Sequence, residues 1–506
     1  MNAKLKASIK KIPGVMPLVA IRNDLRLSYQ SALHRLSLPP EPSVNRAVRR
    51  LLRIGQKNIN QPAEVFLGEL ERARAEFAKT ERPDLSLKLD IVKAINLMVN
   101  KHEYLHFRVQ KVGRPSGFML DTVNACQLGC ATCQHSFNKE WTAMAFVPMP
   151  KGTMKPDTYE SFLHSVGLRS YVGHFYNNSE PFLNKKTPQY LRTANLYRIQ
   201  TMVSSNMSIP KLDAEAIVES GLDHLMTAID GTTQEVYQKY RRGGHLDVVF
   251  ENVRRIVEAK KRLQSATPRL KWQFLTFEHN VHQVDDAIAL AEKLGYDTFN
   301  VATPYDVSGD DPSIRVSVHP QAGANVVFRP ETKPTVWKQN LEPISQEIEG
   351  AFHESLLGRY AKLGSQIEAK PAQGYCDWLH LGIVSDALGR IHPCCLPDYK
   401  SQGSFVFGAL QTNGGDLFNS EKYQQARLLF ADEKAYHANK LQDRDQTSKC
   451  ERCTSRPLPQ IGLGAVFAYL RSTTNLAYPG LFNDPEIRRM LTEWSRHNTE
   501  YHFATT

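Results

Sequence analysis

Three cysteines within eight residues carry the most specific chemical signal of this chain. Cys126, Cys130 and Cys133 stand in a CxxxCxxC spacing within the segment DTVNACQLGCATC, directly after the strand-like run GFMLDTV. Three thiolates so close together can ligate three corners of a four-iron cluster and leave the fourth iron open to a small molecule. A structural zinc site that combines these cysteines with His135 is the alternative.

The remaining cysteines lie toward the C-terminus. Cys376 and Cys394 flank the run LGIVSDALGRIHP, which predicts a β-hairpin that brings the two residues together across neighbouring strands. Cys450 and Cys453 form a CxxC pair that can close a four-sulfur site with them. Zinc also accepts four cysteines, so a zinc site is the alternative here too. Cys395 is left over.

A folded framework must position the three cysteines of the first loop. The hydrophobic periodicity of the sequence changes at about Phe118, where a helical pattern ends. From there, strand-like and helical runs alternate in about six β–α repeats, which indicates a parallel sheet with right-handed crossovers. A closed barrel of this type needs eight repeats, so we expect an open, partial (β/α)6 barrel. Such sheets build their sites at the C-terminal ends of the strands. The cysteine loop begins where the first expected strand ends.

The whole chain then divides into five predicted parts. Residues 1–112 are basic and helical, and residues 113–305 form the partial barrel. An extended connection occupies 306–370, a small cysteine-rich domain 371–456, and a helical tail 457–506. The fold class is therefore α/β, with an N-terminal helical region and a small C-terminal domain.

Composition limits the remaining possibilities. The chain has 506 residues, a formal net charge of +11 and 41% hydrophobic residues. No apolar run is long enough for a transmembrane helix, so we expect no stable membrane insertion. The basic N-terminus lacks the apolar core of a secretory signal, which predicts a cytoplasmic protein whose grouped cysteines bind metal rather than form disulfides. A metal-stabilised (zinc or Fe–S) protein that binds nucleic acid through its basic helices, without catalysis, is the second hypothesis.

The cysteine loop at the end of the first strand of a partial barrel resembles the radical S-adenosylmethionine (SAM) superfamily. This resemblance implies that Cys126, Cys130 and Cys133 hold a [4Fe–4S] cluster whose fourth iron binds S-adenosylmethionine. It implies reductive cleavage of that cofactor to a 5′-deoxyadenosyl radical, which abstracts hydrogen from a substrate. It also implies an electron donor such as flavodoxin or ferredoxin.

Segments at the later strand ends extend the resemblance. NNSEPFLN resembles the family's GGEP-type motif, which implies that Glu180 receives the ammonium group of the cofactor. VSSN resembles a family STN segment and offers Ser205 and Asn206 as polar contacts. AIDGTTQEVYQKYRRGG resembles the SxDGxxxExYxxxR stretch, which implies Asp230 as a ribose or site contact and Arg241 as a partner of the cofactor carboxylate. LTFEHN resembles the segment that ends strand five.

Two positions depart from the family pattern. Ser179 stands where a glycine usually precedes the glutamate, and Thr132 stands where an aromatic residue is frequent. An enzyme that keeps the cluster but no longer cleaves the cofactor is therefore a third hypothesis.

The C-terminal cysteines resemble the SPASM or twitch extension of radical SAM enzymes. Since no cysteine follows Cys453, the resemblance implies one auxiliary [4Fe–4S] cluster, ligated by Cys376, Cys394, Cys450 and Cys453. A fully ligated cluster passes electrons, which favours substrate oxidation. A redox-neutral epimerisation is the rival, with Cys395 as hydrogen donor if it faces the barrel mouth.

The substrate class stays open at this stage: a small or conjugated molecule, or a peptide side chain. The sequence identifies no catalytic base. Several polar side chains lie near expected strand ends, and strand-end placement alone does not distinguish catalytic from structural ones: His174, Tyr176, Glu278, His279 and Tyr305.

Overall fold

The structure is a computed structural model. It describes residues 108–131, 133, 150–304, 311, 313–329, 376–395, 406–410, 416–438 and 450, with single positions between 49 and 104 and residue 485. Every described position between 49 and 104 is helical, and the extent of the predicted helical N-terminal region stays a prediction. Four residues of the sequence analysis lie outside the described residues: Thr132, His135, Tyr305 and Cys453.

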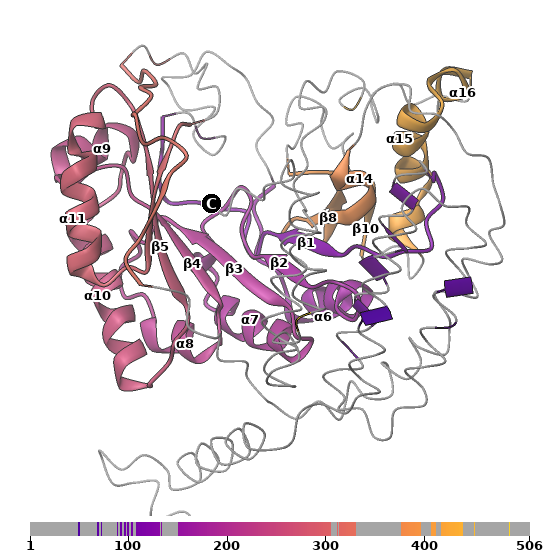
Figure 1. Cartoon of the computed structure of the whole chain (residues 1–506), viewed down its shortest axis with the longest axis horizontal. Helices are drawn as coiled ribbons and strands as arrows, with labels where there is room; N and C mark the ends of the chain where they lie inside the picture. The colour runs from indigo at the N-terminus through magenta and orange to yellow at the C-terminus, as the bar shows by residue number, and fades with distance from the viewer. Residues whose placement is uncertain are drawn as a thin grey trace, which may run out of the picture.

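A mixed sheet of ten strands forms the centre of the described part of the chain (Figure 1). Its strand order is β10-β9-β8-β1-β2-β3-β4-β5-β6-β7, and β1 to β6 are parallel neighbours in chain order. The predicted six-stranded parallel sheet is therefore confirmed. The strands are β1 Gly117–Leu120, β2 Val172–His174, β3 Gln200–Ser205, β4 His224–Ala228, β5 Arg269–Leu275, β6 Thr298–Ala302, β7 Asn325–Val327, β8 Gly382–Ser385, β9 Arg390–His392 and β10 Gly408–Ala409.

Helices connect the parallel strands, as right-handed β–α repeats require. Those of the barrel are α6 Pro156–Val166, α7 Thr187–Leu196, α8 Ala214–Glu219, α9 Gln234–Tyr240, α10 Leu246–Arg262 and α11 Val284–Leu294. Figure 1 shows them along the outer side of the curved sheet. The C-terminal helices are α14 Asp377–Leu381, α15 Glu421–Ala431 and α16 Glu433–Ala438.

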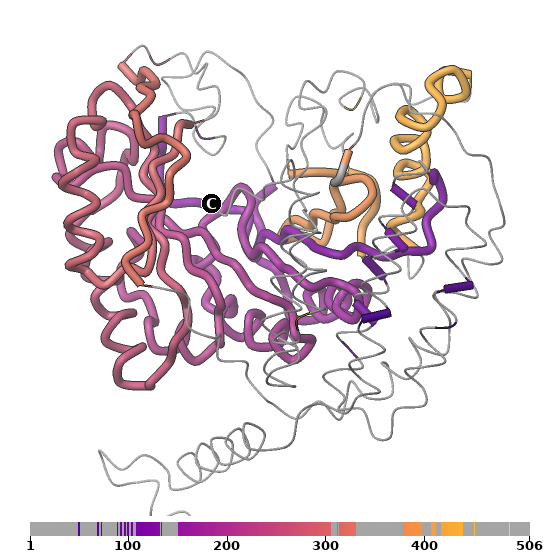
Figure 2. Tube along the Cα trace, in the orientation of Figure 1, coloured from indigo at the N-terminus to yellow at the C-terminus, as the bar shows by residue number. Residues whose placement is uncertain are grey.

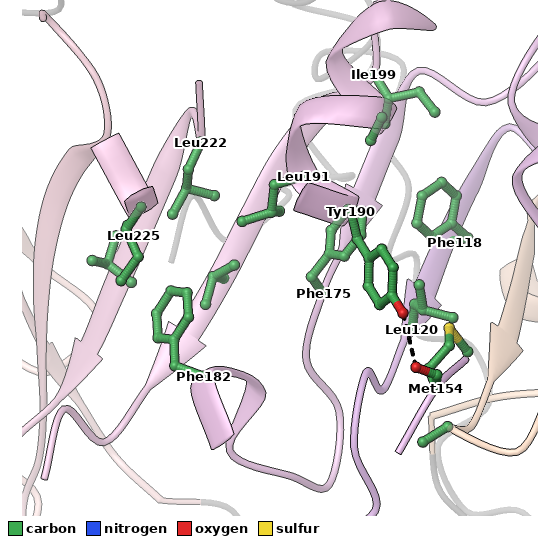
Figure 3. Close-up of a cluster of buried hydrophobic side chains, with 14 of the residues drawn as sticks. Phe118, Leu120, Met154, Phe175, Phe182, Tyr190, Leu191, Ile199, Leu222 and Leu225 are labelled. Atoms are coloured by element: carbon green, nitrogen blue, oxygen red, sulfur yellow. Dashed lines mark hydrogen bonds between the residues drawn. The ribbon is translucent and has the colours of Figure 1, made fainter. Parts of the chain in front are cut away.

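Alternate residues of each strand point toward these helices and form the main hydrophobic core. Phe118 of β1 packs edge-on against Phe162 of α6, with ring centroids 5.1 Å apart. The hydroxyl of Tyr190 in α7 donates a hydrogen bond of 2.8 Å to the carbonyl of Met154, as Figure 3 shows. The strand residues between these core positions lie on the face opposite the helices.

The C-terminal strands continue the same sheet. β8 lies parallel to β1 over four residue pairs, from Gly117–Gly382 to Leu120–Ser385. β9 folds back antiparallel on β8, so the predicted hairpin is confirmed. Its turn places Gly389 at φ +76°, a conformation that favours glycine. Figure 2 shows this orange hairpin beside the purple trace of β1. Within the described part of the chain, no helix is long and apolar enough to cross a membrane.

Candidate metal and cofactor site

The first cysteine loop lies at the C-terminal end of β1, as predicted. Backbone hydrogen bonds fix it to the C-terminal end of α9: the Gly129 N–H donates to the Arg242 carbonyl at 2.8 Å, and the Ala131 N–H donates to the Tyr240 carbonyl at 3.2 Å. The three cysteines share one small hydrophobic cluster with Leu128, Tyr240 and Phe277. The loop is thus seated on the end of the barrel.

Two polar side chains donate to the sulfur atoms of this loop. Asn206 Nδ2 lies 3.7 Å from Cys126 Sγ, and Arg241 Nη1 lies 3.7 Å from Cys130 Sγ. Cys126, Cys130 and Cys133 form no disulfide among the described residues. Burial raises the pKa of Cys126 to about 12, so a bound cation is needed to stabilise its thiolate.

Glu180 lies at the centre of a second group of contacts. It follows β2, is 2% exposed, and accepts hydrogen bonds from Ser205 Oγ at 2.9 Å and the Asn206 N–H at 2.7 Å. Burial raises its pKa to about 7, against the lowering effect of these donors and of Arg241. A carboxylate has about four acceptor positions, so it can accept a further cationic donor such as an ammonium group.

Asp230 and Arg241 form a buried ion pair next to the cysteine loop. Arg241 Nε donates to Asp230 Oδ2 at 2.6 Å, and the Leu275 N–H donates to Asp230 Oδ1 at 2.8 Å. Asp230 has no exposed surface. Both carboxylate oxygens are therefore engaged by the protein. Arg241 joins the ion pair to Cys130, and the predicted contacts of Asp230 and Arg241 with the cofactor stay predictions.

The structure adds three residues that the sequence analysis missed. Asp121, directly after β1, accepts hydrogen bonds from the Asn177 N–H at 3.0 Å and Ser179 Oγ at 2.5 Å. The departure from glycine at Ser179 thus supplies a bond that holds the loop carrying Glu180. A carboxylate at the end of the first strand was a signal for this role.

Gln127 and Asn124 tie the cysteine loop to its surroundings. Gln127 Nε2 donates to Asn206 Oδ1 at 2.9 Å. Asn124 Oδ1 accepts from the Ala387 N–H at 2.9 Å, in the turn between β8 and β9. No sequence signal distinguished these amides, because their partners are far away in the chain.

The second cysteine set converges on α15. Cys376, Cys394 and Cys450 all lie within electrostatic range of the Tyr423 hydroxyl, whose pKa is raised first by burial and then by these thiols. All three pack against the main core, and among the described residues none of them forms a disulfide. Cys376, Cys394 and Cys450 therefore all lie near Tyr423, and the predicted ligation of one cluster by these cysteines and Cys453 stays a prediction.

Cys395 lies near Tyr176. Burial, and then the nearby Cys395 thiol, raise the pKa of Tyr176 to about 12. Tyr176 follows β2, so Cys395 lies near the C-terminal ends of the barrel strands.

The donor set at both places suits iron–sulfur clusters, which bind cysteine thiolates. Of the described residues, no group of three His, Cys, Asp or Glu side chains is arranged to hold a single metal ion. A four-iron cluster is larger than one ion, so its ligands need not meet at one point.

Comparison with known protein families gives one match. Residues 376–454 match the SPASM family model, described as an iron–sulfur cluster-binding domain. This match confirms the predicted SPASM extension and its iron–sulfur cofactor. Together with the thiol loop on the partial barrel, it supports the predicted class, a radical SAM enzyme with a SPASM domain. A search of curated proteins finds no match.

A comparison with solved structures finds chains whose backbones partly superpose on this one. SuiB of Streptococcus suis bound to S-adenosylmethionine is 12% identical, with 74% of this chain and 77% of that chain covered and a TM-score of 0.38. A structure of anSMEcpe with bound AdoMet is 15% identical, covering 77% and 100%, with a TM-score of 0.37. BtrN in complex with AdoMet and 2-DOIA is 14% identical, covering 66% and 92%, with a TM-score of 0.31. Because all three TM-scores are below 0.5, these similarities do not indicate the activity of this chain.

Proposed function

We propose that this chain is a radical SAM enzyme that abstracts hydrogen from its substrate and carries one auxiliary cluster. One observation carries the proposal: the cysteine loop at the end of β1 lies beside the hydrogen-bonded group of Glu180, Ser205 and Asn206. These residues come from the ends of three neighbouring strands. A parallel sheet builds its sites at this edge.

Each part of the arrangement has a distinct task. Cys126, Cys130 and Cys133 would hold the cluster, and Glu180 would receive the ammonium group of S-adenosylmethionine. When bound, cluster and cofactor supply the one-electron chemistry that yields a 5′-deoxyadenosyl radical. Arg241 donates to Cys130 and, as a half-buried cation, would offset negative charge at the sulfur ligands.

The surrounding contacts fix these groups in place. Asp121 and Ser179 hold the loop before Glu180, and Asn206 contacts both Glu180 and Cys126. Asn206 is therefore the physical link between the cluster ligands and the expected cofactor group. Such preorganisation limits the reorganisation needed when the cofactor binds.

Oxidation of a small or conjugated molecule, or of a peptide side chain, is the reaction we favour. The convergence of Cys376, Cys394 and Cys450 supports an auxiliary cluster that accepts an electron, with Cys453 as its fourth ligand. Epimerisation is the second candidate, favoured by the position of Cys395 near Tyr176 at the barrel mouth. Flavodoxin or ferredoxin is the electron donor that we expect for either reaction.

The test is anaerobic reconstitution of the full chain. We expect iron and labile sulfide at both cysteine sets, and 5′-deoxyadenosine when S-adenosylmethionine and a reductant are added. Replacing Cys126, Cys130 and Cys133 together by alanine should abolish 5′-deoxyadenosine formation. Replacing Cys450 and Cys453 should leave uncoupled cleavage in place.

Two results would contradict the proposal. Bound zinc without labile sulfide would indicate a structural metal site. A fully cluster-loaded protein that forms no 5′-deoxyadenosine would indicate the third hypothesis, an enzyme that has lost cofactor cleavage.

A further inference from the structure

Arg427 is a fully buried arginine in α15. It is 0% exposed, and its hydrogen bonds within the described part of the chain all go to uncharged oxygen atoms. Nε donates to the Leu379 carbonyl and Nη2 to the Phe418 carbonyl, both at 2.7 Å. Nη1 donates to the Val109 carbonyl at 3.1 Å and to Asn419 Oδ1 at 3.4 Å. These partners fix the guanidinium in place, but none of them neutralises its charge.

The carboxylates that act on Arg427 are already paired with other cations. Burial lowers the pKa of Arg427 to about 10, with the charges of Glu103 and Asp416 among the opposing effects, so Arg427 stays protonated at neutral pH. Glu103 forms an ion pair with Lys111 Nζ at 3.0 Å. Asp416 forms an ion pair with Arg114 Nη1 at 2.7 Å. A buried cation is costly unless an anion accompanies it, so the surroundings of Arg427 suit a further negative group.

Tyr423 connects Arg427 to the second cysteine set. It lies four residues before Arg427, one helical turn away on the same face of α15. The guanidinium carbon of Arg427 lies 5.2 Å from the centroid of the Tyr423 ring. The hydroxyl of Tyr423 donates to the His392 carbonyl at 3.1 Å, two residues before Cys394. The Tyr423 side chain therefore reaches from the guanidinium to a cysteine segment.

Arg427 itself contacts the segment of another cysteine. Its bond to Leu379 joins α15 to α14, the helix that begins directly after Cys376 and lies beside α15 in Figure 1. Cys376, Cys394 and Cys450 pack against the core that includes Leu379 and Tyr423. Two side chains of α15 thus hold the segments of two predicted cluster ligands, and one of these side chains carries a buried positive charge.

We infer that Arg427 is the buried charge partner of the auxiliary cluster and raises its reduction potential. A cluster held by thiolates has a net charge and surroundings that set its potential, and each added electron makes it more negative. A fixed cation therefore stabilises the reduced form more than the oxidised form. Arg427 is a positioning and charge-compensating residue that does not contact the substrate. The inference rests on the proposed function, in which the substrate radical loses one electron and the auxiliary cluster gains it.

A redox titration of the auxiliary cluster tests this role. The parent protein is the full chain with Cys126, Cys130 and Cys133 all replaced by alanine, so that the C-terminal cysteine set alone is available for a cluster. It is reconstituted anaerobically with iron and sulfide. Electron paramagnetic resonance then follows the reduced cluster as the applied potential is changed.

Two substitutions of Arg427 in this parent separate charge from hydrogen bonding. Arg427→Gln keeps neutral N–H donors and removes the charge, whereas Arg427→Lys keeps the charge with fewer donors. We expect Arg427→Gln to shift the one-electron equilibrium about tenfold toward the oxidised cluster, a potential lower by about 59 mV. Arg427→Lys should retain most of the potential of the parent. Arg254 in α10 has a side chain that is 54% exposed, and Arg254→Gln is the control that should leave the potential unchanged.

Several results would overturn the inference. One is an equal potential in Arg427→Gln and the parent. Another is an equal shift in Arg427→Gln and Arg427→Lys, because hydrogen bonding rather than charge would then set the potential. Iron and labile sulfide are measured in every sample. Loss of the cluster from Arg427→Gln alone would support the charge partnership, whereas its loss from both Arg427 variants would indicate a packing role and overturn the inference.

The parent protein distinguishes this inference from the proposed function. A reconstituted parent without iron, labile sulfide and a reducible cluster signal would refute the proposed auxiliary cluster. A fully loaded parent whose potential does not respond to Arg427→Gln would refute the role of Arg427 alone.

Discussion

Adjacent arginines provide a controlled test of how the cysteine loop is supported. Arg241 pairs with Asp230, whose side chain is fully buried, and Arg242 pairs with Asp311 at a more exposed position. The exposed side-chain fractions are 12% and 0% for the first pair and 31% and 12% for the second. Replacement of each arginine by methionine removes one guanidinium from each environment.

The structure predicts that the two substitutions lower the free energy of unfolding by very different amounts. Arg241→Met leaves the Asp230 carboxylate buried, with the Leu275 N–H still donating to Oδ1 but no cation beside Oδ2. Removing one partner of a buried ion pair costs about 3–5 kcal/mol. Arg242→Met breaks a partly solvated pair and should cost about 1 kcal/mol or less.

Urea denaturation of the cofactor-free full chain measures both costs. Trp272 is a suitable reporter, because its indole N–H donates to the Ile229 carbonyl at 2.8 Å, one residue from Asp230. A double-mutant cycle with Asp230→Asn should recover about 2–3 kcal/mol of coupling with Arg241. Equal losses for the two arginine variants, or no coupling between Asp230 and Arg241, would refute the reasoning.

Two further predictions concern the loop that follows β2. Glu180→Gln should weaken S-adenosylmethionine binding about 10- to 100-fold, because a charged hydrogen bond is lost. The iron and sulfide content of the protein should stay unchanged. An unaltered Kd for S-adenosylmethionine would contradict the role assigned to Glu180. Burial raises the pKa of Asp121 from 3.8 to about 6, so the folded state binds more protons than the unfolded state between these values. The free energy of unfolding should therefore fall by roughly 3 kcal/mol as pH rises from about 4 to 6. Asp121→Asn should reduce this pH dependence, measured by urea denaturation at each pH. An equal pH dependence in both proteins would show that other groups cause it.

Much of the framework followed from the sequence because it depends on local patterns. Regular alternation of strand-like and helical runs predicted the order of β1 to β6, and the turn before Gly389 predicted the β8–β9 hairpin. The three-cysteine loop followed from its spacing. In each case the signal lies within a few residues of the structure that it specifies.

Features that depend on contacts between distant parts of the chain could not be predicted from the sequence. The parallel pairing of β8 with β1 joins segments about 260 residues apart, and no local pattern encodes that choice of neighbour. The face on which a strand residue lies depends on register, since a shift of one residue would turn His174 toward the helices. The roles of Asp121 and Gln127 likewise depend on partners far away in the chain.

The sheet itself connects the two cysteine sets. β1 carries the first cysteine loop at its end and pairs along its whole length with β8, whose hairpin leads to Cys394. Asn124, two residues before Cys126, accepts from the Ala387 N–H in that hairpin and donates to the Pro150 carbonyl at 2.9 Å. The first cysteine loop and the hairpin before Cys394 are therefore held in one hydrogen-bonded framework. A fixed separation of this kind suits electron transfer between the barrel site and an auxiliary cluster, because the transfer distance then does not depend on domain motion.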